Sequence, residues 1–288
     1  MAYVSLKEIL SVRQGYAVGA FNIVNYLTME SVVCAAEEEK ASLIIQTSTS
    51  TIKHYGLSPL VAWVKVLADK ASVPVAMHLD HCKDLEMIKA CVKSGWSSVM
   101  FDGSSFPFEK NVEMTRQAVK IAHKDGVTVE GELGAIVGVE EDIKVKDRSA
   151  TLADPKQSIK FVEQTGVDIF APAVGTAHGL YKYEPKVDFK RLAKISKEVG
   201  VPVALHGGTG LTAEVFQKSI SSGVSKINIS TQLKISYIDS LKNYIARNEK
   251  EYNPIKMLSY VRSQVQKMAC GFIRIFGSSG KATKEEKE

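Results

Sequence analysis

Short apolar segments alternate with amphipathic segments along most of the chain. The apolar segments have the length and the valine-rich composition of buried strands, and each is followed by the apolar spacing of a helix. Strands are predicted over 16–21, 42–46, 73–79, 97–101, 127–133, 168–174, 201–205 and 226–229. The helices that follow them are predicted over 28–40, 59–71, 84–93, 108–124, 155–165, 189–199, 212–222 and 231–246. This alternation is typical of parallel α/β folds.

The number of repeats and the chain length favour one closed barrel. Glycines stand between a predicted helix and the next strand, where a left-handed helix end is expected, at Gly95, Gly126, Gly166, Gly200 and Gly223. The 288 residues, 45% of them hydrophobic, can form one large core. We predict a (β/α)8 TIM barrel as a single domain over residues 1–280. A doubly wound sheet is the alternative, but no Gly-x-Gly-x-x-Gly motif follows the first strand.

Three segments lie outside the eight repeats. A short helix is predicted over 5–12, before the first strand. A longer helix over 254–276 is more than a barrel needs, so we expect an appended helix that covers the barrel or reaches a neighbouring subunit. Residues 281–288 are mostly charged, and we expect them to form a disordered tail.

Charge and cysteine content narrow the class of partner and compartment. The net charge is +5, but the basic residues are dispersed, so we expect no nucleic acid and consider phosphorylated metabolites compatible. The cysteines at 34, 82, 91 and 270 lack the spacing of a zinc ribbon or a disulfide framework, which favours a reducing compartment. Neither a membrane-spanning run nor a signal core is recognisable. We therefore expect a cytoplasmic protein with no membrane contact.

Polar residues gather at the predicted carboxyl ends of the strands, where barrel enzymes place their active sites. These residues are Asp80, His81, Asp102, Glu132, His178 and His206. One such histidine is more often a hydrogen-bonded core residue, but three together favour a catalytic divalent metal site, most often zinc. His54, His78 and His123 are weaker candidates. Neighbouring residues on a strand face opposite sides, so Asp80 and His81 share a site only if the strand ends there and the backbone turns.

The segments after the last two strands are typical of a phosphate site. Residues 205–210 and 228–231 combine glycines or small polar residues with the start of a helix, whose N–H groups bind anions. Ordinary turn glycines and helix caps are the alternative. The long segment 134–154 contains Glu140, Glu141 and Asp142, which could form either a lid over the site or a solvated acidic turn.

A metal beside a phosphate pocket favours chemistry on a phosphorylated sugar or ketone. Carbon–carbon cleavage next to a carbonyl needs an electron sink, which is either a lysine Schiff base or a metal. No lysine closes any predicted strand, whereas three histidines do, so the metal is favoured.

At these residues the chain resembles the class II, metal-dependent ketose-bisphosphate aldolases, which include fructose-1,6-bisphosphate and tagatose-1,6-bisphosphate aldolases. The likeness covers nearly the whole chain and rests on motifs at 78–81, 98–102, 129–134, 175–179, 207–210 and 226–229. The resemblance implies that His81, His178 and His206 are catalytic zinc ligands. It also implies that Asp102 and Glu132 serve an alternative or second metal position.

The resemblance further implies how the substrate is bound and how protons move. Asp80 would move a proton at the substrate C4 hydroxyl, and Glu141 would be the acid–base group of the lid. A pocket for dihydroxyacetone phosphate would be formed by Gly179, Gly207, Gly208, Thr209, Asn228, Ile229, Ser230 and Thr231, with a monovalent cation (Na⁺ or K⁺) near the first two glycines. Asn22, Ser48 and the appended helix would contact the distal half of the substrate. Family members are dimers or tetramers, so a homodimer or homotetramer is expected.

The chain departs from the family pattern in two places. Gly138-Val139 stands where the family usually has two glycines, which leaves the choice between Glu140 and Glu141 open. The segment 253–256 reads Asn-Pro-Ile-Lys rather than Asp-Pro-Arg, so the ligand of the distal phosphate is unassigned.

The function expected from these observations is zinc-dependent, reversible cleavage of a ketohexose 1,6-bisphosphate. The products would be dihydroxyacetone phosphate and glyceraldehyde 3-phosphate. Fructose and tagatose bisphosphates differ at C4, and only the motif at 175–179 leans towards the tagatose type. An aldolase for another phosphorylated ketose or keto acid is the alternative. A non-catalytic partner subunit is a further alternative. Such a subunit would be marked by loss of the metal ligands, but all three histidines and Asp80 are present.

Overall fold

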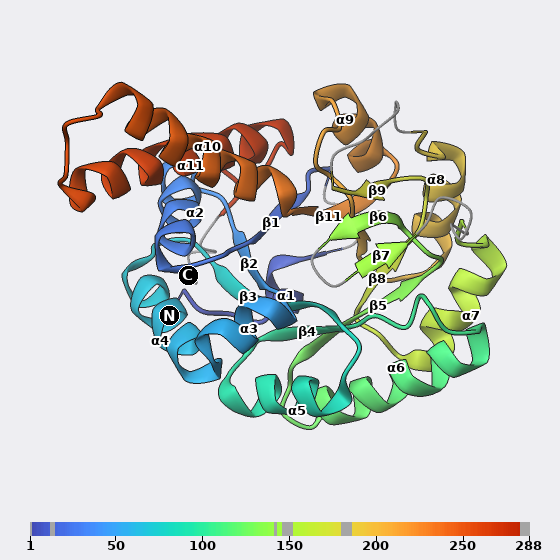
Figure 1. Ribbon diagram of the computed structural model, residues 1–288. Helices are drawn as coiled ribbons and strands as arrows, with labels where there is room; N and C mark the ends of the chain where they lie inside the picture. Colours follow the sequence, from blue (N-terminus) through green and yellow to red (C-terminus); the bar gives the residue numbers. More distant parts are fainter. Residues whose placement is uncertain (1, 12–14, 141–142, 146–151, 180–185, 283–288) are drawn as a thin grey trace, which may run out of the picture.

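The computed structural model describes residues 2–11, 15–140, 143–145, 152–179 and 186–282. Within these residues, the barrel strands are β1 (Val18–Asn22), β2 (Leu43–Thr47), β3 (Val75–Cys82), β4 (Ser98–Phe101), β5 (Thr128–Leu133), β8 (Ile169–Pro172), β10 (Val203–Leu205) and β11 (Val224–Ile229). They pair in parallel, in the order β1-β11-β10-β8-β5-β4-β3-β2, and the sheet closes on itself (Figure 1). The predicted TIM barrel is confirmed, and each predicted strand coincides with one of these.

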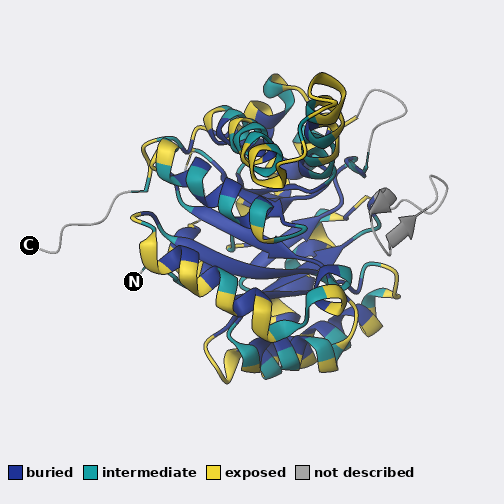
Figure 2. Cartoon of the chain, turned by 60° about the vertical axis from the view of Figure 1, so that its left-hand side comes forward, coloured by how far each residue is buried: buried dark blue, intermediate teal, exposed yellow. Residues whose placement is uncertain are grey.

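Helices surround the barrel. They are α1 (Leu6–Ile9), α2 (Tyr26–Glu39), α3 (Thr49–Tyr55), α4 (Leu57–Lys70), α5 (Leu85–Ser94), α6 (Phe108–His123), α7 (Pro155–Thr165), α8 (Phe189–Glu198), α9 (Ala213–Ser221), α10 (Thr231–Arg247) and α11 (Pro254–Ile275). The barrel strands are buried, whereas most of the surrounding helices bury one face and expose the other (Figure 2). The five turn glycines all have positive φ, between 70° and 110°, as the helix ends require.

Some helices begin or end away from the predicted positions because of local capping. Helix α2 begins two residues earlier than predicted, since the Asn25 side chain accepts a hydrogen bond from the Thr28 backbone N–H. Ser48 caps α3 in the same way, through the backbone N–H of Thr51. The pattern alone did not predict α3, because a helix of seven residues is too short to display a helical repeat.

A small sheet stands beside the barrel and was not predicted. Strands β6 (Val137–Glu140), β7 (Ile143–Val145) and β9 (Ala177–His178) pair in the order β7-β6-β9. Strands β6 and β7 fall inside the segment that was expected to be a long loop. Their register joins Gly138 to His178, so this sheet connects the predicted lid segment to one of the three site histidines.

The appended helix α11 covers one side of the barrel. It packs along α2 and beside α10, and it also contacts α9 and β1 (Figure 1). Phe272 of α11 and Phe276 just beyond it lie against Phe216 of α9, with ring centroids 6.0 Å and 5.1 Å away. Residues 283–288 of the expected disordered tail lie outside the described residues.

An apolar cluster closes the amino-terminal end of the barrel. Leu6, Ile9 and Leu10, in and just after α1, pack against Val18, Ala20, Ile44, Ala76, Ile169, Ala171 and Ala204. The strand residues of this cluster are small or aliphatic and point into the barrel. Across the described ranges, none of the helices is both long enough and apolar enough to span a membrane.

Candidate active site

The residues proposed for catalysis come together at the carboxyl ends of the barrel strands. Asp80 and His81 lie near the end of β3, and Glu132 lies near the end of β5. Asp102 directly follows β4 and His206 directly follows β10, while His178 comes from β9 of the small sheet. The chain therefore builds the site from four barrel strands and one strand outside the barrel.

An irregular backbone lets consecutive residues of β3 face the same site. His81 has φ 48°, in the left-handed region that residues other than glycine rarely adopt. The pairing of β3 with β4 shifts in register between Leu79 and Cys82, on either side of this residue. The turn expected after Asp80 is thus present inside the strand rather than at its end. Such a strained residue is typical of functional sites, because the surrounding fold must hold it in place.

Three imidazoles and two carboxylates form a buried cluster that could hold a metal. The ring centroid of His81 lies 4.8 Å from that of His178 and 4.7 Å from that of His206. His81 also lies within 3.2 Å of Asp102 and 3.8 Å of Glu132 through its Nδ1. The potential ligand atoms of the three histidines lie within 4.8 Å of one another, as do those of His81, Asp102 and Glu132.

The electrostatics of this cluster fit a divalent cation. Burial, reinforced by Asp102, raises the pKa of Glu132 well above its ordinary value. Burial also lowers the pKa of His178 well below its usual range, and His81 and His206 add to this. The buried Oε2 of Glu132 has no hydrogen-bond partner among the described residues. A cation bound by imidazole nitrogens and carboxylate oxygens would compensate these groups, and such a donor set suits zinc.

Asp80 is held as an ionised carboxylate beside the cluster. Its Oδ2 accepts a hydrogen bond from Asn22 Nδ2 at 2.8 Å, and its Oδ1 accepts one from Asn228 Nδ2 at 3.2 Å. Burial alone would raise the pKa of Asp80, but the nearby His81 and His206 outweigh it and hold the pKa at about 2. The carboxylate is therefore positioned by two amides and is available as a proton acceptor at ordinary pH.

The glycine segment after β10 is held against neighbouring backbone. A Cβ on Gly207, which has φ 69°, would lie 2.4 Å from the carbonyl oxygen of Ala177, and one on Gly208 would lie 2.7 Å from that of Asn228. Both glycines are therefore needed for close packing in this loop. The hydroxyl of Thr209 accepts a hydrogen bond from the Gln232 backbone N–H in the first turn of α10. Thr209 thus links the segment 207–210 to the first turn of α10 through this hydrogen bond.

Several other expected contact residues lie nearby. Asn228 and Ile229 end β11, Ser230 precedes α10, and Thr231 is the first residue of that helix. The buried Ser230 Oγ has no hydrogen-bond partner among the described residues. Ser48 is used as the cap of α3, and its Oγ also contacts that of Ser50 at 2.9 Å. Gly179 directly follows β9 with φ 83°. The expected lid residue Glu141 lies outside the described residues, as does Asp142.

Sequence reasoning missed a buried polar network that underlies the site. Glu130 and Lys226, both fully buried, form an ion pair with 2.9 Å between Oε2 and Nζ. Burial would raise the pKa of Glu130, but Lys226 holds it well below its ordinary value. His78 also belongs here, since its Nε2 lies 3.7 Å from Glu130 Oε2, while its Nδ1 lies 2.8 Å from Ser98 Oγ. Strand alternation could have found these residues: Glu130 precedes Glu132, and Lys226 precedes Asn228, by two positions on the same inward face.

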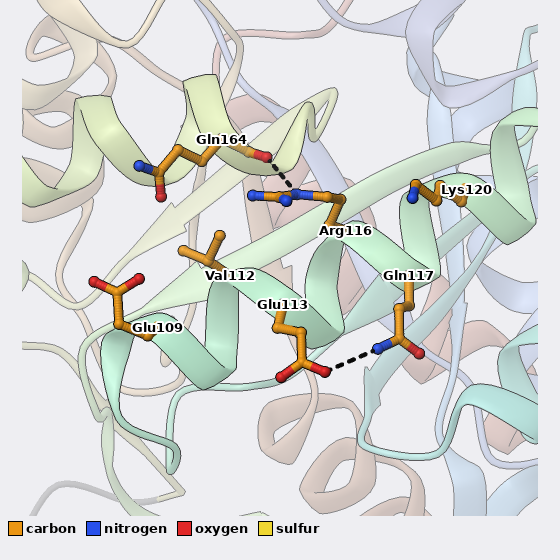
Figure 3. Close-up of a pocket in the computed structure, with 7 residues that line it drawn as sticks. All are labelled: Glu109, Val112, Glu113, Arg116, Gln117, Lys120 and Gln164. Atoms are coloured by element: carbon orange, nitrogen blue, oxygen red, sulfur yellow. Dashed lines mark hydrogen bonds between the residues drawn. The ribbon is translucent and has the colours of Figure 1, made fainter.

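A hollow lies on the outer layer of helices, away from this cluster. Its lining residues belong to α6 and α7, and Figure 3 shows them as Glu109, Val112, Glu113, Arg116, Gln117, Lys120 and Gln164. Arg116 Nε donates a hydrogen bond to the carbonyl oxygen of Gln164 at 3.0 Å. The hollow contains none of the residues that the chemistry requires, and it is polar and open. We regard it as a surface groove between two helices.

Relatives of known family and structure match nearly the whole chain. The family model described as class II fructose-bisphosphate aldolase matches residues 4–281. A fructose-bisphosphate aldolase of Geobacillus stearothermophilus is 42% identical over 287 residues, which is 98% of this chain and 99% of the relative. A sulfofructosephosphate aldolase of Alkalicoccus urumqiensis is 37% identical over 284 residues, 98% of this chain and 99% of the relative.

A solved aldolase structure also matches nearly the whole chain. The crystal structure of the YdjI aldolase from Escherichia coli K12 superposes with a TM-score of 0.84 at 31% sequence identity, covering 98% of this chain and 100% of that chain. Sequence identities of 31–42% over nearly the full length of both chains are typical of members of one family. The three histidines on which the resemblance rested also lie together in the structure. The chain belongs to the class II fructose-bisphosphate aldolase family, and it is an aldehyde-lyase.

Proposed function

We propose that the protein reversibly cleaves a ketohexose 1,6-bisphosphate to dihydroxyacetone phosphate and glyceraldehyde 3-phosphate. The observation that carries this proposal is the ionised Asp80, held by two amides directly beside a cluster of three imidazoles. This arrangement offers a proton acceptor and a site for an electron sink at the same end of the barrel, which is what aldol cleavage requires.

A divalent cation, for which we propose zinc, would be held by His81, His178 and His206 and would polarise the substrate carbonyl. Asp102 and Glu132 would offer an alternative or second position for it, since both lie close to His81. Asn22 and Asn228 keep the Asp80 carboxylate oriented towards the substrate.

Asp80 removes the proton from the C4 hydroxyl in the proposed cleavage step. The C4–O bond becomes a carbonyl, the C3–C4 bond breaks, and its electron pair stays with C3. Glyceraldehyde 3-phosphate leaves as the aldehyde, and a proton delivered to C3 completes dihydroxyacetone phosphate. We assign this second proton to Glu141 from the family resemblance.

The phosphate of dihydroxyacetone phosphate is proposed to lie where β10 and β11 lead into the next helices. Residues 207–209 and the start of α10 would supply backbone N–H groups there, because a helix N-terminus favours an anion. The buried hydroxyl of Ser230 offers a further donor. Gly179 and Gly207 are proposed to line the site of a monovalent cation. Asn22 and Ser48 are proposed to face the distal half of the substrate.

A panel of substrates tests this proposal. Initial rates would be measured on fructose 1,6-bisphosphate, tagatose 1,6-bisphosphate and sulfofructose phosphate, and the product of the reverse condensation would be identified. We expect a ketohexose bisphosphate to be cleaved fastest. The sulfonated sugar is included because one relative acts on it by name. Much faster cleavage of that sugar, or no cleavage of any substrate, would refute the proposal.

We also propose that the protein assembles as a homodimer or homotetramer in the cytoplasm. Large apolar side chains are exposed along α10, in the segment after it and at the start of α11, at Ile238, Ile245, Tyr252 and Ile255. Burying such a patch against a second copy would remove it from water.

All four cysteines are free thiols, which supports a reducing compartment. Sedimentation of the purified protein tests the assembly, and a monomer at micromolar concentration would contradict it.

A further inference from the structure

Glu130 and Lys226 lie beneath the active site, and each contacts one of its residues. Glu130 contacts His206 of the metal cluster, and Lys226 contacts Asn228 of the proposed substrate pocket. Both side chains are fully buried inside the barrel, where Glu130 of β5 and Lys226 of β11 meet although their strands are not adjacent in the sheet. Lys226 Nζ lies 2.9 Å from Glu130 Oε2 and donates a hydrogen bond to Asn228 Oδ1 at 2.8 Å. Glu130 Oε1 lies 2.7 Å from His206 Nε2. The pair is thus connected on one side to a metal-cluster histidine and on the other to a partner of Asp80.

We propose that the buried Glu130–Lys226 ion pair is a positioning pair. Glu130 determines which ring nitrogen of His206 points to the metal cluster. Lys226 determines whether the amide nitrogen or the amide oxygen of Asn228 points to Asp80. This inference rests on the proposed function for its catalytic half, whereas its metal-binding half stands on the cluster alone.

The first half follows from what a carboxylate can accept. The Glu130 side chain is an ionised carboxylate beside the ammonium group of Lys226, so it can only accept hydrogen bonds. His206 Nε2 must therefore carry a hydrogen and donate it to Glu130 Oε1. The lone pair of the neutral ring then lies on Nδ1. This Nδ1 faces the cluster, 2.9 Å from His81 Nε2 and 3.4 Å from Glu132 Oε2. Glu130 therefore keeps His206 in the tautomer that can bind a cation.

The second half follows from what an ammonium group can donate. Lys226 has no acceptor, so the atom of Asn228 that lies 2.8 Å from it must be the carbonyl oxygen. The amide nitrogen then points the other way and donates to Asp80 Oδ1 at 3.2 Å. A neutral side chain at position 226 would not impose this orientation, since the Asn228 amide could turn over. Lys226 therefore keeps the general base correctly hydrogen-bonded.

Three variants separate positioning from simple stabilisation: Lys226→Met, Glu130→Gln and the double variant. Removing one charge of a buried pair leaves the other uncompensated, whereas replacing both with neutral groups of similar size is often harmless to stability. Each variant would be assayed for its thermal midpoint, for the Zn²⁺ dissociation constant of the metal-free protein, and for kcat on the best substrate of the panel. Gln117→Ala, in the surface groove of α6, is the control that should match the wild type in all three.

In Glu130→Gln, Lys226 attracts the amide oxygen and turns the amide N–H₂ towards His206. The histidine must then carry its hydrogen on Nδ1, and Zn²⁺ binding should weaken by about 10 to 100-fold. In the double variant the glutamine is free to turn its oxygen back to His206. Both the thermal midpoint and the Zn²⁺ affinity should then return towards the wild type. The value of kcat should stay about 100-fold low in Lys226→Met and in the double variant, because Asn228 has lost its donor.

The outcomes decide each half separately. Glu130→Gln that binds Zn²⁺ as tightly as the wild type would overturn the role of Glu130. A double variant that regains kcat together with its thermal midpoint would show that the pair only stabilises the barrel, and would overturn the role of Lys226. If the wild type cleaves no substrate of the panel, the proposed function fails. The Zn²⁺ and thermal measurements, which need no substrate, would still test Glu130.

Discussion

The two ends of the barrel interior are built from alternate positions of the same strands, yet they differ completely in chemistry. On β3 the inward residues change from Ala76 to His78 and then Asp80, and on β1 they change from Val18 through Ala20 to Asn22. The amino-terminal end is apolar and covered by α1. The carboxyl-terminal end is a buried set of imidazoles, carboxylates and amides.

This difference separates stability from function within one core. At the amino-terminal end, each buried aliphatic side chain favours the folded state because it is removed from water. At the carboxyl-terminal end, the buried carboxyl groups of Asp102 and Glu132 lie close together, and the strained His81 contacts both. These groups cost stability, so the apolar end and the helical layer must offset them. Substitutions at the two ends should therefore change different properties.

The largest effect is expected from Asp80→Ala at the carboxyl-terminal end. Loss of the positioned base should lower kcat by about two to four orders of magnitude. The three histidines remain, so metal content should stay unchanged. The thermal midpoint should fall somewhat, because Asn22 and Asn228 lose their hydrogen-bond acceptor and the favourable interactions of the ionised carboxylate are removed. Steady-state kinetics, metal analysis and a melting curve test this together, and near wild-type turnover would refute the role given to Asp80.

Leu6→Ala at the amino-terminal end should have the opposite profile. Leu6 is fully buried, and its truncation leaves a cavity under the barrel. The free energy of unfolding should fall by about 2 to 5 kcal/mol, measured by urea denaturation. The kcat per folded molecule should be unchanged below the unfolding transition. A parallel loss of kcat in fully folded protein would mean that the two ends are coupled.

A smaller, pH-dependent effect is expected from Tyr3, which lies beside the first residue of β3 and donates a hydrogen bond to the carbonyl oxygen of Gly95 at 2.6 Å. Burial raises the pKa of Tyr3 from 10.0 to about 12. A group with a raised folded-state pKa stabilises the fold below its unfolded pKa and loses this contribution as pH rises through the folded value. The protein should thus lose stability between about pH 10 and 12.

Tyr3→Phe is the matching variant. At pH 8 it should lose about 1 kcal/mol of stability with its hydrogen bond. Its urea midpoint should then fall less than that of the wild type when pH is raised above 10. An equal fall in both proteins would contradict the assignment. Asp80 behaves in the opposite sense, because its pKa is lowered in the folded protein. Its contribution to stability is lost only as pH falls from the ordinary pKa of an aspartate towards about 2.

Much of this architecture could be predicted from the sequence, because each barrel strand is a short apolar run followed by a helix. The convergence of His81, His178 and His206 could also be predicted from the shared carboxyl edge of parallel strands, although His178 itself lies on β9 outside the barrel. The left-handed backbone of His81 could not be foreseen, because it depends on a register shift between two strands. The β7-β6-β9 sheet was missed because its strands are two to four residues long and β9 pairs with β6 across a long stretch of sequence.

The central claim is that the histidine cluster holds a divalent metal that serves as the electron sink. The direct measurement is titration of metal-free protein with Zn²⁺ while cleavage of the best bisphosphate is followed. Activity should be absent without metal, rise with added Zn²⁺ to a plateau set by the histidine site, and stay near the background in His206→Ala. Treatment with borohydride in the presence of substrate should leave the enzyme active. Full activity of metal-free protein, or its inactivation by borohydride, would contradict the account.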